Sequence, residues 1–211
     1  MNPEIQATGY RNPDVSDTAI DRAVASFVAA YFESSAIHPR WQHVLERLSR
    51  DKSICCVIAT DHYAEATSYI VGHLKALGIP AVPVDSSDTA VSGHIYIANS
   101  ADLGVHKVNL RFWEVLKNVL PVEGIKEVML VDDFGFNETS GDAYAALAKV
   151  DKRKALTEAL LKDAFSVPVY MVSFMIEELL GERESYDRER TVADHILRVS
   201  TVITDRLWPS V

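Results

Sequence analysis

Four short apolar runs, separated by stretches with helical periodicity, constrain the fold of this chain more than any other feature. The runs are SICCVIA, HIYIA, EVMLV and VPVYMVSF, at residues 53–59, 94–98, 127–131 and 167–174. Runs of this length are typical of strands that are covered on both faces. Because strands that alternate with helices form βαβ units, the pattern predicts an α/β fold. It favours a mainly parallel sheet with helices on both faces.

The segments between the runs supply the expected helices. Apolar residues recur at helical spacing from Asp17 onward, and helices are also expected at residues 39–49, 63–77, 109–119, 142–161 and 192–208. The helix at 142–161 is expected to break near Asp151. Gly78 is expected to end its helix in a left-handed conformation. Pro83 restricts residues 81–84 to an edge strand, since proline lacks an N–H for the ladder.

A chain of 211 residues is long enough for a single α/β domain with a substantial core. We expect an irregular arm at 1–16, a helical segment at 17–49, an α/β core at 53–175 and a C-terminal helix at 186–208. The last helix carries an apolar stripe that packs within the chain or forms a homodimer surface. The stripe consists of Val192, Ile196, Val199, Ile203 and Leu207.

Composition excludes some partners. The net charge of −9 argues against nucleic acid and against anionic membranes, since both require a cationic face. No apolar run approaches the about 20 residues of a membrane span. The two cysteines, Cys55 and Cys56, lie inside an apolar run and are interpreted as reduced core residues. The first residues contain no pattern of a secretory signal, so a cytoplasmic location is expected.

Polar residues follow three of the predicted strands. Thr60 follows the first, Lys107 comes shortly after the second, and Asp132 and Asp133 follow the third. Ligands of parallel sheets bind outside the carboxyl ends of the strands. A lysine suits a phosphate, and paired carboxylates suit Mg²⁺. The sequence therefore predicts a site for a small phosphorylated ligand, with a role for Mg²⁺, at this edge.

The order of these motifs resembles the haloacid dehalogenase (HAD) superfamily of phosphatases and related hydrolases. VIAT, ending in Thr60, is similar to the strand whose hydroxyl contacts the phosphate in that family. SADLGVHKVNLRFWEVL is similar to the segment that supplies a phosphate-side lysine, here Lys107. VMLVDDF is similar to the strand whose acids hold Mg²⁺, here Asp132 and Asp133. The resemblance covers roughly residues 39–146 and implies a three-layer HAD-like Rossmannoid fold, with residues 17–49 in place of a cap.

The first motif of the HAD family, an apolar strand followed by a nucleophilic aspartate, is not recognisable. The nearest match is PDVSDT, with Asp14 as the candidate nucleophile, although Ser16 or Asp17 is also a good helix cap. The family's central strand would come from residues 4–10, be donated by another chain, or be replaced by its neighbours. Without a carboxylate nucleophile no aspartyl-phosphate forms. The resemblance therefore implies a degenerate member that binds or interacts without catalysis. The alternative is an active Mg²⁺-dependent phosphohydrolase that uses Asp14.

Each site residue also has a purely structural interpretation. Thr60 could cap the helix expected at 63, and Lys107 could be a solvated residue or the partner of an aspartate. Asp132 and Asp133 could form an ordinary turn at the end of the strand. Glu138 and Asp142 are candidates for capping the next helix or for assisting the metal.

Overall fold

The computed structural model of the chain describes residues 17–86, 93–137, 147–176 and 185–209. The chain divides into two units, residues 1–36 and 37–211. The first unit contains helix α1 (Asp17–Ser34), which begins where the apolar periodicity begins. The predicted irregular arm and the candidate nucleophile Asp14 lie outside the described residues.

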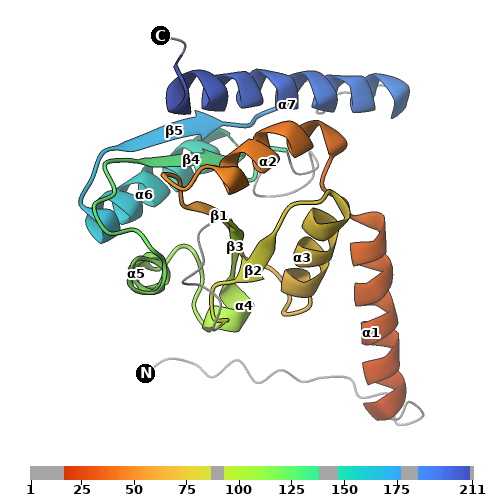
Figure 1. Cartoon of the computed structure of the whole chain (residues 1–211). Helices are drawn as coiled ribbons and strands as arrows, with labels where there is room; N and C mark the ends of the chain where they lie inside the picture. Colours follow the sequence, from red (N-terminus) through yellow and green to blue (C-terminus); the bar gives the residue numbers. More distant parts are fainter. Residues whose placement is uncertain (1–16, 87–92, 138–146, 177–184, 210–211) are drawn as a thin grey trace. The chain divides into compact units, whose positions relative to one another are not determined.

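The second unit contains the strands of the described residues, alternating with helices (Figure 1). In chain order its elements are η1 (Pro39–Trp41), α2 (Gln42–Arg50), β1 (Cys56–Thr60), α3 (Ala66–Ala76), β2 (Ala81–Pro83), β3 (Ile95–Asn99), α4 (Ser100–Leu103), α5 (Leu110–Val119), β4 (Val128–Asp132), α6 (Leu147–Phe165), β5 (Val169–Ser173) and α7 (Ser185–Leu207). The α/β class predicted from the apolar runs is confirmed.

The described strands pair in parallel throughout and form two hydrogen-bonded groups. One group has the order β1-β3-β2, and the other is the pair β4-β5. The short strand β2, which contains Pro83, lies at an edge as predicted, where its missing N–H breaks no ladder. Strand β3 lies between two partners, and all five of its residues are buried. A single continuous sheet was expected, but no ladder joins β1 to β4 among the described residues.

Helices cover both faces of the strands. Alternate residues of β1, β3 and β4 contribute to one apolar cluster with α5 and α6, centred on Phe112, Trp113 and Leu161. The other face of β1 and β3 packs on α3 through Leu74. The other face of β4 and β5 packs on α2 and α7 through Val44, and Figure 1 shows α7 running along this pair. The two strand groups thus share one core, because side chains of a strand alternate between its faces.

Several helix boundaries differ from the sequence predictions. Helix α3 begins at Ala66 rather than at 63, and α6 continues through Asp151, so the expected break there is wrong. A lone aspartate weakens a helix too little to interrupt one that packs along its length. The short helix α4 was not predicted. Gly78 follows α3 with φ of 74°, which confirms the left-handed helix end.

The apolar stripe of α7 is used within the chain. Ile196, Val199 and Ile203 are buried, and the last two join the cluster around Val44. Leu197 and Val202, on other sides of the helix, are exposed. A homodimer through α7 stays a prediction, and it would have to use residues outside the stripe. In the part of the chain that the structure describes, no helix combines the length and apolar character needed to cross a membrane.

Candidate functional site

Lys107 lies between the carboxyl ends of β1 and β4. Its Nζ atom donates a hydrogen bond to the carbonyl oxygen of Ala59 at 3.4 Å and is 3.9 Å from Oδ2 of Asp132. The side chains of Lys107 and Asp132 are 27% and 30% exposed, so both are shielded but open to solvent. The structure therefore brings together the lysine and one of the acids that the sequence singled out. We name Thr60, Lys107 and Asp132 the strand-end site.

The backbone around Lys107 is fixed by its neighbours. The Lys107 N–H donates to Oδ1 of Asp61 at 3.1 Å, and the Trp113 indole N–H donates to the Lys107 carbonyl at 2.9 Å. His106 Nδ1 lies 3.4 Å from the same Asp61 oxygen. Because Trp113 is anchored in the core, these contacts hold the lysine at the strand ends without relying on its flexible side chain.

Buried Asn99 ties the loop after β1 to the end of β3. Its side-chain nitrogen donates to the Tyr63 carbonyl at 2.8 Å, and its oxygen accepts from the N–H groups of His62 and Ala101, both at 3.3 Å. An unpaired buried amide is costly, so these bonds strongly favour this one loop conformation. Asn99 directly follows the strand predicted at residues 94–98, and the sequence assigned it no role.

The adjacent aspartates Asp132 and Asp133 differ in their contacts. Asp133 accepts from the N–H of Gly135 at 2.8 Å with Oδ1 and from the N–H of Asn137 at 3.3 Å with Oδ2. Among the described residues Asp132 accepts a hydrogen bond from the Phe134 N–H alone, with Oδ1 at 3.1 Å, and its Oδ2 faces Lys107. Strand alternation explains this, because Asp132 continues the face of Leu130, toward α5 and α6. Asp133 organises the turn, whereas Asp132 belongs to the strand-end site.

The turn after Asp133 includes a residue in an unusual conformation. Phe134 has φ of 53° although it is not glycine, and it is buried against Phe136 and Val150. A bulky residue in the left-handed region costs of order 1–3 kcal/mol. Burial of its ring and the hydrogen bonds of the two aspartates offset that cost. The turn is therefore held in one conformation directly beside the strand-end site.

Mg²⁺ would find few ligands among the described residues. They contain no group of three or more histidine, cysteine, aspartate or glutamate side chains that could hold a metal ion. Both oxygens of Asp133 accept backbone N–H groups, and the remaining oxygen of Asp132 faces an ammonium group. This arrangement suits a lysine better than a second cation at the same place. Binding of Mg²⁺ stays a prediction, and the metal would have to complete its shell with ligand oxygens.

Thr60 is the last residue of β1, and its side chain is half-buried. The interpretation of Thr60 as a helix cap is wrong, because the residue before α3 is Glu65 and Thr60 lies too far away in the chain. Its hydroxyl makes no hydrogen bond to the residues that the structure describes. By strand alternation its side chain continues the face of Cys56 and Ile58, toward α3, whereas Asp132 lies on the face toward α5 and α6. Glu138 and Asp142 lie outside the described residues.

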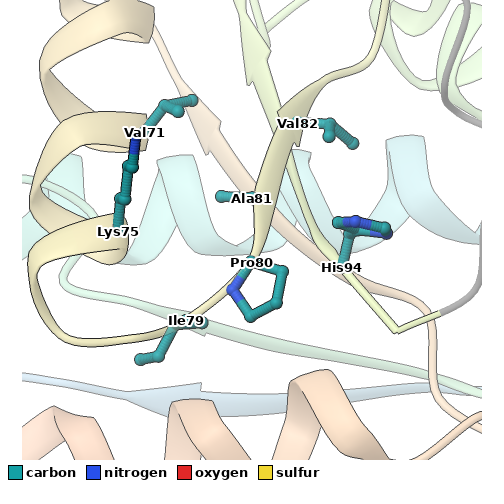
Figure 2. Close-up of a pocket in the computed structure, with 7 residues that line it drawn as sticks. All are labelled: Val71, Lys75, Ile79, Pro80, Ala81, Val82 and His94. Carbon is teal, nitrogen blue, oxygen red and sulfur yellow. The ribbon is translucent and has the colours of Figure 1, made fainter.

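A pocket of about 200 Å³ lies elsewhere, between α3 and the starts of β2 and β3. Figure 2 shows Lys75 and Val71 on the helix and Pro80 and His94 across from them. The pocket contains none of the strand-end residues, and it lies at the amino ends of the parallel strands, the opposite edge from Thr60. It is therefore not an extension of the strand-end site.

No protein-family model matches the sequence, and comparison with curated proteins and with solved structures finds no similar chain. The arguments for function therefore rest on the residues themselves.

Proposed function

We propose that the chain binds a small phosphorylated molecule at the carboxyl ends of β1 and β4 without cleaving it. The observation that carries the proposal is the half-buried ammonium group of Lys107, held between Ala59 and Asp132. A lysine ammonium has three donors. The contacts at 3.4 Å and 3.9 Å are long for charged hydrogen bonds, so the group keeps capacity for a closer anion.

Asp132 defines the ligand further. Asp132 offers a carboxylate acceptor beside the lysine, which repels an anion but accepts a hydroxyl. A ligand with hydroxyl groups next to its phosphate satisfies both requirements. We therefore favour a sugar phosphate or a nucleotide as the class of ligand.

We propose binding without cleavage because the nucleophile motif is not recognisable in the sequence. Among the described residues the first strand is β1, so none of them places a carboxylate-bearing strand ahead of Thr60. Asp132 is already the neighbour of the lysine, and Asp133 holds the turn. The fold that we expect for such a binding module is a three-layer HAD-like fold, in a degenerate member of that family. The resemblance stays a prediction, and the binding proposal does not depend on it.

A direct binding experiment tests the proposal. Sugar phosphates and nucleotides are titrated into the protein, with and without Mg²⁺, and binding is followed by calorimetry. We expect at least one ligand to bind, and Lys107→Met to weaken that binding by at least tenfold. Lys126→Met is the matched control, because Lys126 is exposed and precedes the amino end of β4, whereas Asp132 lies at its carboxyl end. Equal losses in both variants, or no binding by wild-type protein, would overturn the proposal.

The same samples distinguish the alternative of an active phosphohydrolase. Release of inorganic phosphate is measured for each ligand that binds. We expect no turnover in the wild-type protein. Turnover that requires Mg²⁺ and disappears in Asp14→Asn would instead establish Asp14 as the nucleophile.

A further inference from the structure

Lys154 on α6 is a second lysine beside the strand ends. Its side chain is half-buried, and Nζ donates to Oγ of Ser173, the last residue of β5, at 2.8 Å. The same atom lies 6.0 Å from the centre of the Phe134 ring, the outer limit of a cation–π contact. No carboxylate of the described residues pairs with it. Partial burial of an ammonium group without a counter-charge is unfavourable. An anion bound at this position would supply the counter-charge.

The register of β4 and β5 places Lys154 close to the strand-end site. Ser173 is the Cα partner of Asp132, so the two residues stand side by side on neighbouring strands. Lys107 approaches Asp132, and Lys154 approaches Ser173. The two ammonium groups are therefore separated by on the order of 10 Å, about twice the spacing of neighbouring strands. That separation accommodates two phosphoryl groups of a single small ligand.

Arg153 adds a third positive charge over the turn between the strands and α6. The nearest atoms to the Cβ position of Gly135 belong to the Arg153 guanidinium, and Gly135 has φ of 75°. Any side chain there would displace the guanidinium and would also strain the backbone. The turn thus brings a cation of α6 close to its backbone, in a protein with a net charge of −9.

We infer that Lys154 and Ser173 form a second anion subsite, and that the ligand carries two anionic groups. The inference rests on the proposed function, because Lys107 supplies the first subsite. One phosphoryl group binds at Lys107, and the other binds at Lys154 and Ser173. The class of ligand is a bisphosphorylated molecule or an oligophosphate, and Asp132 accepts a hydroxyl between the two groups where the ligand has one.

Inorganic phosphate and inorganic tripolyphosphate test the second subsite without assuming a particular sugar. Calorimetric titrations compare the wild-type protein with Lys154→Met, in which the apolar stem is preserved. We expect wild-type protein to bind tripolyphosphate at least tenfold tighter than phosphate. Lys154→Met is expected to abolish this advantage while leaving phosphate binding within twofold. Lys107→Met is expected to weaken the binding of both anions.

Lys152→Met is the matched control, since Lys152 is exposed on the same helix and carries the same charge. Thermal unfolding of each variant verifies that it folds. If phosphate binds but tripolyphosphate has no advantage, or if Lys152→Met removes that advantage as fully as Lys154→Met, the second subsite is wrong and the proposed function stands. If neither anion binds to wild-type protein while a sugar phosphate or nucleotide does, the second subsite is wrong and the proposed function stands. If none of these ligands binds, both proposals fail.

Discussion

The charges at the end of α7 and the charges at the strand ends are arranged differently. At the end of α7 the Arg206 guanidinium forms two hydrogen bonds with Glu127, one of them at 3.1 Å. The Trp208 indole donates to Asp51 at 2.7 Å, and the Arg47 guanidinium lies 3.9 Å from the centre of the Trp208 ring. At the strand ends, Lys107 is 3.9 Å from its acid, and Lys154 donates to a hydroxyl and pairs with no carboxylate of the described residues. We name Asp51, Glu127, Arg206 and Trp208 the α7 charge cluster.

The difference indicates what each group of charges does. In the α7 charge cluster every polar group has a close partner, as expected where polar contacts attach a helix to the rest of the fold. Hydrogen bonds from Ser53 and Trp208 hold the pKa of Asp51 below its ordinary value, and the Arg206 guanidinium does the same for the pKa of Glu127. The strand-end lysines keep unused donors in a shielded position. Such positions are typical of ligand sites rather than of structural contacts.

The largest effect is expected from the two adjacent aspartates, which repeat the comparison on a smaller scale. Asp133→Ala removes the acceptors of two backbone N–H groups and should lower the free energy of unfolding by about 1–3 kcal/mol. Asp132→Ala should lower it by less, because Asp132 accepts one such bond and its other oxygen faces a lysine. Urea denaturation measures both variants. Equal losses would contradict the division of roles between the two residues.

Within the α7 charge cluster, Trp208→Phe removes the indole donor and keeps a ring beside Arg47. The lost hydrogen bond to Asp51 should lower the free energy of unfolding by about 1 kcal/mol. Trp41→Phe is the control, because Trp41 packs against Phe174 and its indole makes no hydrogen bond with the described residues. A loss no larger than in this control would mean that the contact with Asp51 does not stabilise the fold.

Replacement of Lys154 should stabilise the protein, whereas the replacements described above should destabilise it. Lys154→Met removes a half-buried ammonium group that lacks a counter-charge, and the free energy of unfolding should rise by about 0.5 kcal/mol in the absence of ligand. The same denaturation experiment measures it. A decrease in the free energy of unfolding as large as that of Trp208→Phe would mean that Lys154 stabilises the fold. The contrast between the strand ends and the α7 charge cluster would then be wrong.

A smaller effect is expected on acidification. The pKa values of Asp51 and Glu127 are lower in the folded chain than their ordinary values of 3.8 and 4.5. Their contribution to stability is therefore complete above those values and is lost as pH falls through the lower, folded-state pKa values. Detachment of Trp208 in this range should change tryptophan fluorescence, measured against Trp208→Phe. In Asp51→Asn most of this pH dependence should disappear, and an unchanged profile would assign it to other groups.

The sequence predicted the strands well because short apolar runs between helices can form few structures other than buried strands. It also predicted that Lys107 and Asp132 approach one another, since both follow parallel strands. Alternation also indicates that the adjacent Asp132 and Asp133 face opposite sides and that one of them organises the next loop, but which one does so depends on where β4 ends. The sequence did not predict Lys154 as a site residue. Its signal was a lysine on the same helix face as the buried Val150 and Leu161, where an apolar residue is expected. Asn99 could not be assigned a role because its partners, His62 and Tyr63, lie on another loop.

A crystal structure of the protein soaked with tungstate, a heavy analogue of phosphate, tests the central claim most directly. The anomalous signal locates the oxyanion without assumptions about the ligand. We predict a peak beside Lys107 at the carboxyl ends of β1 and β4, within about 4 Å of the Lys107 Nζ atom. An empty strand-end site, with a peak only in the pocket beside Lys75 and His94, would contradict the account.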